Sequence, residues 1–305
     1  CSSDNYRPVF RDIVSEMINQ MPDFSSDNGE VYNCEFSSHE LCMAITNSGN
    51  TSVGPDSLHY AFFKHMTEHQ VAELLKLMNH LWCSGTYPSA WRHSILVPIP
   101  KPGKPRDNVA SYRPIQLTSC LSKLMERMIA NRLAWYIEDR SLLSRYQSAF
   151  RKGRCTTDHL IRLDSDVRRG FLSNKYTLAV FLDLKNAYNL TSTVALLTKL
   201  HRLGFKGRLM NFIREYLRGR TFQVSCGGLS DVFEQENGLV QGGVLSPILF
   251  NLMIDDIFTD VPDEVKYAIY ADDCSLWIQG KQIQPLIATI QDSLDRISRW
   301  ADHWG

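Results

Sequence analysis

The stretch Tyr267-Ala-Ile-Tyr-Ala-Asp-Asp-Cys-Ser-Leu-Trp-Ile278 sets two adjacent aspartates, Asp272 and Asp273, between two short apolar runs. Aromatic and β-branched runs on both sides of a polar pair are typical of a β-hairpin with the pair at its turn. Adjacent carboxylates repel each other, so a fold gains from holding them together when a divalent cation neutralises their charge. The alternative is an ordinary turn, in which Asp is common.

A further carboxylate follows another apolar run. Residues Leu178-Ala-Val-Phe-Leu182 predict a short buried strand, and Asp183 comes directly after it. Three aspartates at strand ends can hold two divalent ions roughly 3.5–4 Å apart, the arrangement that catalyses in-line phosphoryl displacement. Taken alone, Asp183 is equally expected as the cap of a following helix. The three acids together favour a metal site of the kind that nucleotide polymerases use.

The charges of the chain are unevenly distributed although they sum to zero. Residues 101–154 carry 12 Lys and Arg against four Asp and Glu, whereas residues 231–273 carry ten acids against Lys266. A basic segment and an acidic segment suit a polyanion path that leads to a metal site. The alternative is a mixed, solvated surface. With 305 residues and 44% hydrophobic content, the chain can bury one core or two subdomains that share one.

The cysteines and the hydropathy pattern predict the cellular compartment of the protein. The eight cysteines form no Cys-x-x-Cys pair, which indicates reduced thiols rather than disulfides or a zinc ribbon. There is no charged-then-apolar leader and no apolar run of membrane-spanning length. We therefore expect an intracellular protein of the cytoplasm or nucleus, neither secreted nor held in a membrane. Because the sequence begins at Cys1, we expect it to be a piece of a longer polypeptide.

Periodicity predicts an α+β fold in which helices pack on one face of an antiparallel, ferredoxin-like sheet. The expected strands are Ile95–Ile99 and Leu178–Leu182, with hairpins at Phe222–Val232 and around Asp272. A soft boundary is expected near residue 175. The expected helices are Pro8–Met21, one long helix through Phe62–Leu81, Leu117–Tyr136, Thr156–Phe171, Thr193–Leu203, Leu209–Leu217 and Pro247–Phe258.

Six sequence blocks, in order, carry a resemblance to a known family. Phe181-Leu-Asp-Leu-Lys-Asn-Ala-Tyr188, Gly238-Leu-Val-Gln-Gly-Gly-Val-Leu-Ser-Pro247 and Tyr270-Ala-Asp-Asp273 resemble the palm motifs of reverse transcriptases. Upstream, three blocks are similar to segments of the non-LTR (LINE-type) retrotransposon branch. They are Ser52-Val-Gly-Pro-Asp56, then Tyr112-Arg-Pro-Ile-Gln-Leu117 with its continuation Lys123-Leu-Met-Glu126 and Arg132-Leu133, and Gln147-Ser-Ala-Phe-Arg-Lys-Gly-Arg154. The resemblance covers roughly residues 50–304.

The resemblance implies a right-hand polymerase fold and an RNA-directed DNA polymerase activity. Residues 1–40 would be an N-terminal extension, residues 41–175 the fingers and residues 176–305 a partial palm that ends before the thumb, within an ORF2-like polyprotein. The implied reaction transfers dNMP from a dNTP to the 3′-OH of a DNA primer on an RNA template. The implied cofactor is a pair of Mg²⁺ ions, for which Mn²⁺ can substitute. No pattern in the sequence predicts an oligomeric state.

The resemblance also implies roles for single residues. Asp183, Asp272 and Asp273 would be the catalytic metal ligands, and the Leu184 carbonyl would complete the shell of one ion. Tyr188 would lie beneath the sugar of the incoming nucleotide, where its ring excludes a 2′-OH; the alternative is an ordinary core tyrosine. The other implied residues are Gln241 and Gly242 beside the nucleotide, Arg113, Lys101 and Lys104 on its triphosphate, and Arg151, Lys152 and Arg154 on the template backbone.

Each of these groups has a plainer interpretation. Gln241 and Gly242 would lie in an ordinary loop that leads into a helix with Ser246 as its cap and Pro247 in its first turn. The loop lysines would simply be solvated, and Arg151, Lys152 and Arg154 would form an exposed basic helix start. Two other functions remain open from the sequence. One is a group II intron or retron-type reverse transcriptase, which shares the motifs around Asp272 and Gln241. The other is an inactive retrotransposon remnant that binds nucleic acid without turnover.

Overall fold

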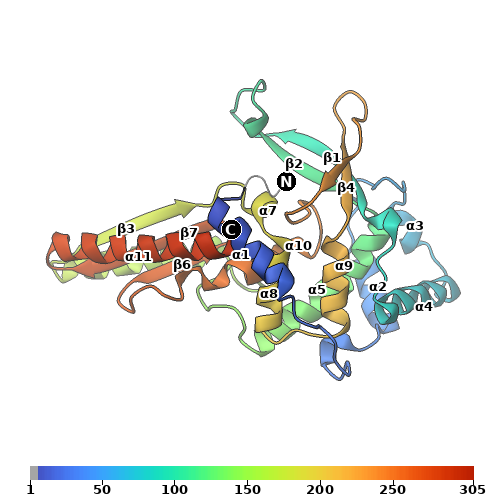
Figure 1. Ribbon diagram of the computed structural model, residues 1–305, viewed down its shortest axis with the longest axis horizontal. Coiled ribbons are helices and arrows are strands. Elements are labelled where there is room, and N and C mark those ends of the chain that lie inside the picture. Colours follow the sequence, from blue (N-terminus) through green and yellow to red (C-terminus); the bar gives the residue numbers. More distant parts are fainter. Residues whose placement is uncertain (1–5) are drawn as a thin grey trace.

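The computed structural model describes residues 6–305 as an elongated molecule with two sheets, one at an end of the molecule and one nearer its middle (Figure 1). One end holds the strands β3 (Tyr176–Asp183), β6 (Lys266–Tyr270) and β7 (Asp273–Gly280). The sheet nearer the middle consists of β1 (His93–Pro100), β2 (Tyr112–Leu117), β4 (Arg220–Val224) and β5 (Phe233–Gln235). Helices fill the space between the sheets and flank both of them.

The three-stranded sheet is antiparallel and has the order β3-β7-β6. In its register Asp183 pairs with Asp273, and Tyr270 also pairs with Asp273 across the β6–β7 turn. The predicted strand before Asp183 and the predicted hairpin around Asp272 are therefore confirmed. This pairing brings two distant parts of the chain together at one end of the sheet.

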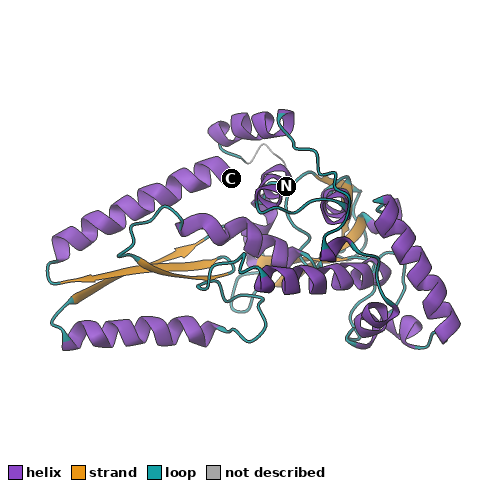
Figure 2. Ribbon diagram, turned by 90° about the horizontal axis from the view of Figure 1, so that it is seen from below, coloured by secondary structure: helices purple, strands orange, loops and turns teal. Residues whose placement is uncertain are grey.

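Long helices cover both faces of this sheet (Figure 2). On one face α11 (Ile283–Trp304) packs so closely that a Cβ added at Gly280 would lie 2.8 Å from Leu286. On the other face α6 (Thr156–Leu172) supplies Asp166, which accepts the indole N–H of Trp277 at 2.9 Å. The expectation of helices on one face only was wrong here, because alternate residues of β7 contact different helices.

The four-stranded sheet has the order β2-β1-β4-β5, in which β1 and β4 run parallel and the other pairs are antiparallel. The strand expected at Ile95–Ile99 and the hairpin expected at Phe222–Val232 are both present. The hairpin extends to residue 235 and joins β1 rather than the sheet that contains β3. Strands from both sides of residue 175 thus share one sheet.

The helices expected at Pro8–Met21, Thr156–Phe171, Thr193–Leu203 and Leu209–Leu217 are present, with ends within two residues of those expected. The long helix expected over Phe62–Leu81 is two helices, because Thr67 and Gln70 form a capping box that starts the second one. The helix expected from Leu117 begins three residues later, capped by the Ser119 side chain. The helices are α1 (Pro8–Asn19), α2 (Ser38–Thr46), α3 (Tyr60–Lys64), α4 (Glu68–Ser84), α5 (Cys120–Asp139), α7 (Ala187–Leu190), α8 (Thr193–Arg202), α9 (Arg208–Leu217) and α10 (Ser246–Ile254).

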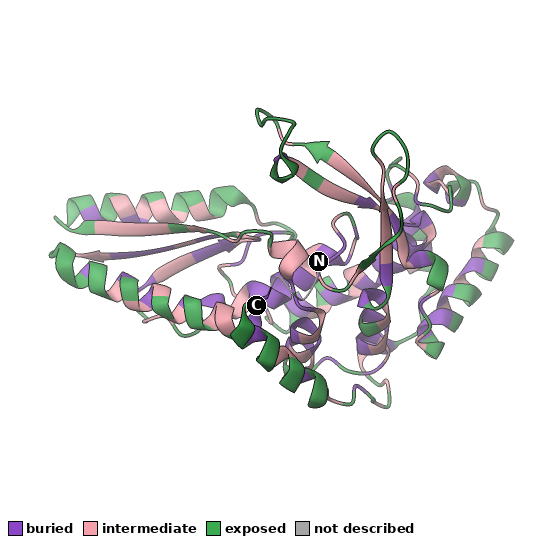
Figure 3. Ribbon diagram, turned by 45° about the horizontal axis from the view of Figure 1, so that its top comes forward, coloured by how far each residue is buried: buried purple, intermediate pink, exposed green. Residues whose placement is uncertain are grey.

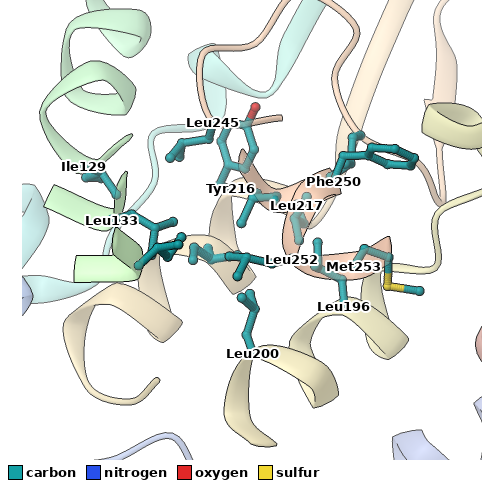
Figure 4. Packing of buried hydrophobic residues seen from close by; sticks show 14 of the residues in the cluster. Ile129, Leu133, Leu196, Leu200, Tyr216, Leu217, Leu245, Phe250, Leu252 and Met253 are labelled. Atoms are coloured by element: carbon teal, nitrogen blue, oxygen red, sulfur yellow. The ribbon is translucent and has the colours of Figure 1, made fainter. Parts of the chain in front are cut away.

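The main core surrounds α10, which is apolar on almost every side. Figure 3 shows buried residues concentrated at the centre of the molecule and exposed ones along the outer helices. Close packing is visible in Figure 4, where Leu252 of α10 lies among Leu133 of α5 and Leu196 and Leu200 of α8. Because neighbours bury it from all directions, α10 gives a rigid base to the loop that precedes it.

A buried lysine ties α8 to α11. The ammonium of Lys199 donates to the Met253 carbonyl at 2.6 Å and pairs with Asp256. It also lies 4.5 Å from the ring centre of Trp300, whose indole N–H donates to Asp256 at 2.8 Å. Burial lowers the pKa of Lys199 to about 8. The cluster anchors the end of α11 on the main core.

Asp255, beside this cluster, is expected to make stability fall with rising pH. Burial raises the pKa of Asp255 from 3.8 to about 6 although the Ser144 N–H donates to both of its oxygens. Between these two values the folded protein binds more protons than the unfolded chain, so stability decreases by on the order of 2–3 kcal/mol as pH rises from 4 to 7. Urea denaturation at both pH values should show a smaller difference for Asp255→Asn; an equal difference would contradict this.

Within residues 6–305, no helix combines the length and the apolar character that a crossing of the lipid bilayer requires.

Candidate active site

The three candidate ligands lie at one end of the β3–β7 pair. Asp183 is the last residue of β3, Asp273 is the first residue of β7, and Asp272 lies in the turn between β6 and β7. Because Asp183 and Asp273 are direct cross-strand partners, their side chains leave the sheet on the same face. The structure therefore brings together the carboxylates that the sequence separates by almost 90 positions.

The turn that carries Asp272 has an unusual backbone. Ala271 is buried and has a φ of 55°, in the left-handed region that costs an L-residue with a Cβ roughly 1–2 kcal/mol. Such conformations persist where the surrounding structure imposes them, and they are concentrated at functional sites. Here the register of Tyr270 with Asp273 leaves two residues, Ala271 and Asp272, for the turn.

The electrostatics of this end of the sheet are those of uncompensated negative charge. Partial burial, then the charges of Asp272 and Asp183, raise the pKa of Asp273 above its ordinary value. Burial, followed by the charge of Asp272, also raises the pKa of Tyr188. No Lys or Arg among residues 6–305 forms an ion pair with any of the three carboxylates.

The charge of the three carboxylates suits a divalent cation bound in an open site rather than one enclosed by protein ligands. Across residues 6–305 no three His, Cys, Asp or Glu side chains are gathered closely enough to enclose a metal ion. Magnesium typically binds through one or two carboxylates and completes its shell with water and substrate phosphates. The facing pair Asp183 and Asp273, with Asp272 alongside, matches that kind of open site.

Tyr188 lies on α7, a single turn that follows Asp183. Its ring stacks on Phe250 of α10, with ring centres 4.8 Å apart and planes 17° apart. Its carbonyl accepts the Leu239 N–H at 2.8 Å, which attaches the loop 238–245 beside it. Leu184, between Asp183 and Tyr188, packs against the core. The stacking fixes the ring position, so Tyr188 is held close to the acidic end of the sheet.

The loop with Gln241 and Gly242 is attached to β2. The Gln116 N–H donates to the Gln241 carbonyl at 2.7 Å, and the Gln241 N–H donates to the Gln116 side chain at 3.2 Å. Gly242 has a φ of 121°, and an added Cβ would lie 2.7 Å from the Gln116 carbonyl. Glycine is therefore required there by contact with β2. The predicted cap by Ser246 is wrong, because its hydroxyl donates to the Val240 carbonyl at 2.7 Å.

A cavity of about 160 Å³ opens between this loop, α7 and the four-stranded sheet. Its polar lining consists of side-chain amides, and its apolar lining comes from the sheet. Carboxamides offer donors and acceptors without charge, which suits contacts to sugar hydroxyls or base edges. The lining residues are Leu96, Pro114, Gln116, Asn189, Phe222, Gln235, Asn237 and Gln241.

The expected triphosphate residues lie on β2 and on the loop before it. Arg113 is exposed on β2, opposite Ile99 of β1. Lys104 is exposed in the loop, while Lys101 is half-buried and donates its ammonium to the Ala110 carbonyl at 3.0 Å. Arg113 and Lys104 are thus open to solvent, and Lys101 is partly occupied by the loop itself.

Of the expected template residues, Arg151 is used inside the protein. Its side chain is 5% exposed and binds both carboxylate oxygens of Glu138 at 2.7 and 2.8 Å. It also donates to the Ser144 carbonyl at 2.7 Å, so its expected role as a template contact is not retained. Arg154 is half-buried and donates to the Arg145 carbonyl at 2.7 Å; Lys152 is exposed.

Two residues beneath the site were given no role by the sequence analysis, although both lie in motifs that carry the family resemblance. Gln116 is buried and joins the loop 238–245 to the sheet. Glu126 is completely buried on α5, and its carboxylate accepts the Val244 N–H at 2.8 Å. An acid on the apolar face of the helix predicted over Leu117–Tyr136 was the available signal for Glu126, because buried acids need partners.

Comparison with known proteins shows the family to which this chain belongs. Residues 99–305 match the reverse transcriptase (RNA-dependent DNA polymerase) family. The RNA-directed DNA polymerase from mobile element jockey of Drosophila melanogaster is 30% identical over 82% of this chain and 28% of its own length. The probable RNA-directed DNA polymerase from transposon BS of the same species is 30% identical over 83% of this chain and 29% of its own.

A more distant relative matches almost the whole chain. The Pol polyprotein of the type-2 retrotransposable element R2DM of Drosophila melanogaster is 27% identical over 94% of this chain and 28% of its own length. The chain thus spans less than a third of the curated relatives it matches. With two thirds of its residues inside the family match, the chain belongs to the reverse transcriptase family, and its relatives are the polymerases of non-LTR retrotransposons.

Proposed function

We propose that this chain is the catalytic part of an RNA-directed DNA polymerase that adds dNMP from a dNTP to the 3′-OH of a DNA primer on an RNA template. The observation that carries the proposal is the facing pair Asp183 and Asp273, with Asp272 in the adjoining turn and no ion pair to Lys or Arg within residues 6–305. The names of the relatives, which are RNA-directed DNA polymerases of mobile elements, support the same reaction.

The residues of the site would have different roles in the reaction, according to their chemistry. Asp183, Asp272 and Asp273, together with the Leu184 carbonyl, would hold two Mg²⁺ or Mn²⁺ ions. When bound, such ions lower the pKa of the primer hydroxyl and neutralise the leaving pyrophosphate. The exposed guanidinium of Arg113 is suited to bidentate contact with phosphate oxygens, with Lys104 as a weaker partner.

The proposed function also implies which parts of the fold are fingers and palm. We assign residues 41–175 to fingers and residues 176–305 to palm, with the β4–β5 hairpin contributing to the fingers through its pairing with β1. Residues 6–40 are not separate from this body, because α1 contacts α8 and α11. Of the expected template contacts, the exposed Lys152 and the half-buried Arg154 remain in the proposal.

Single-nucleotide extension tests the activity. A DNA primer annealed to an RNA template is incubated with the protein and one dNTP, in Mg²⁺ and in Mn²⁺, at high protein concentration. The proposal expects addition of the complementary dNMP and not of the other three. Binding of the primer–template without any addition would instead indicate an inactive remnant that only binds nucleic acid.

Divalent ions are also expected to stabilise the folded protein in the absence of nucleotide. An ion concentration about five times the Kd adds about 1 kcal/mol to the free energy of unfolding, because the ion binds only where the carboxylates are assembled. Thermal melting of the parent chain should therefore shift upward in MgCl₂ relative to KCl of equal ionic strength. The shift should disappear in Asp183→Asn, and its persistence there would place the ion elsewhere.

A further inference from the structure

A carboxylate is buried beneath the N-terminus of α10. Glu126 of α5 is 0% exposed. Its Oε2 accepts the backbone N–H of Val244 at 2.8 Å and that of Leu245 at 3.4 Å, and the Tyr216 hydroxyl donates to the same oxygen at 3.4 Å. Its Oε1 accepts the hydroxyl of Ser122 at 3.1 Å. Of these four donors, two are therefore backbone N–H groups of the loop before α10.

The backbone of the loop rests directly on this group. A Cβ added at Gly243 would lie 2.5 Å from the Tyr216 hydroxyl oxygen and 3.3 Å from Glu126 Oε2. Figure 4 shows Leu245 beside the Tyr216 ring at the same place. Burial, followed by the charge of Glu126, raises the pKa of Tyr216 well above its ordinary value, so the hydroxyl stays protonated as a donor.

The other half of the loop is held from the opposite side. Gln116 of β2 exchanges two hydrogen bonds with the backbone of Gln241, at 2.7 and 3.2 Å. Gln116 is in turn fixed by its amide, which donates to the Gln235 side chain at 2.8 Å. The loop is thus attached at Gln241 to the sheet and at Val244 to α5, and the side chain of Gln241 lines the cavity next to Asn189.

We propose that Glu126 is a positioning residue for the incoming nucleotide, through the loop that carries Gln241. This inference rests on the proposed function, because it concerns the nucleotide bound beside Tyr188. The N-terminus of α10 has no side-chain cap of its own, since the Ser246 hydroxyl is engaged by Val240. A carboxylate makes hydrogen bonds about twice as strong as a neutral acceptor does, so it can hold this end of the loop.

Glu126→Gln is the variant that tests the inference, with Glu40→Gln as the matched control. Glu40 also accepts a backbone N–H, from Ser37 at 2.8 Å, and it pairs with Arg132 on the same helix α5. The control therefore makes the same chemical change at a helix-capping glutamate that does not contact the loop. Both variants are compared with the parent chain in amide hydrogen exchange, which requires no catalysis.

In Glu126→Gln the amides of Val244 and Leu245 should exchange roughly tenfold faster than in the parent, because their charged acceptor is lost. In single-nucleotide extension the KM for the dNTP should rise about tenfold while kcat changes less than about twofold. A merely structural role would lower kcat through loss of folded protein and leave KM unchanged. Glu40→Gln should change neither the exchange of these two amides nor KM.

A second variant perturbs the same contact by a change in the loop instead of in α5. Gly243→Ala should give the same rise in KM, because its methyl group displaces the loop from Tyr216 and Glu126. Adding Tyr216→Phe removes the atom 2.5 Å away and should restore part of the affinity. Unchanged exchange at Val244 and Leu245 in Glu126→Gln, or unchanged KM in both variants, would overturn the inference. If the parent chain adds no nucleotide, the proposed function fails, and the exchange data alone decide whether Glu126 anchors the loop.

Discussion

Asp272→Asn is expected to lower the rate of nucleotide addition by on the order of 10³-fold or more, because it removes a metal ligand from the site. The same change should raise, not lower, the melting temperature of the metal-free protein. The charge of Asp272 contributes to the raised pKa of Asp273, which means that the two carboxylates repel each other when both are ionised. Loss of activity together with a gain of stability distinguishes a ligand from a structural aspartate.

The assay for this prediction is single-nucleotide extension, followed by thermal melting in a chelating buffer. Asp231→Asn provides the control, since Asp231 is exposed and precedes the short strand β5, away from the β6–β7 turn. The control should retain parent activity and a parent melting temperature. If Asp272→Asn kept more than a tenth of the parent rate, the turn would have to be reassigned as structural.

The acidic residues of the site could be predicted because their signals are local. An apolar run that ends in Asp183, and a two-residue turn at Asp272 inside an alternating hairpin, are each contained within about ten residues. The face that they share follows once β3 and β7 pair. The pairing of β1 with β4 is different, because the partners Ile95 and Gln223 lie 128 positions apart and no local pattern specifies that contact.

The partners of buried charged side chains also could not be predicted from the sequence. Arg151 lies in a basic motif and reads as a surface residue, but Glu138 at the end of α5 takes its guanidinium out of solvent. Glu126 shows the reverse case, since its partners are backbone N–H groups at Val244 and Leu245 that no side-chain pattern reveals. Hydrogen bonds to backbone depend on how the chain packs, so only the structure assigns them.

Tyr188→Val is expected to make the protein accept ribonucleotides. The stack on Phe250, with ring centres 4.8 Å apart, holds the Tyr188 ring in one place, and a fixed ring can exclude a 2′-OH by contact. Replacing it with the smaller side chain should increase rNTP incorporation relative to dNTP roughly a hundredfold. Competing extension with rNTP and dNTP of the same base measures that ratio directly.

Tyr188→Phe tests the contribution of the aromatic ring to sugar discrimination separately from that of the hydroxyl. The phenyl ring can keep the stack on Phe250, so the discrimination should stay within about threefold of the parent value. Phe250→Leu should give an intermediate result, because the ring of Tyr188 remains but loses the surface that fixes its position. A parent-like ratio in Tyr188→Val would mean that the sugar is selected elsewhere, with the amide-lined cavity beside Gln241 as the next place to test.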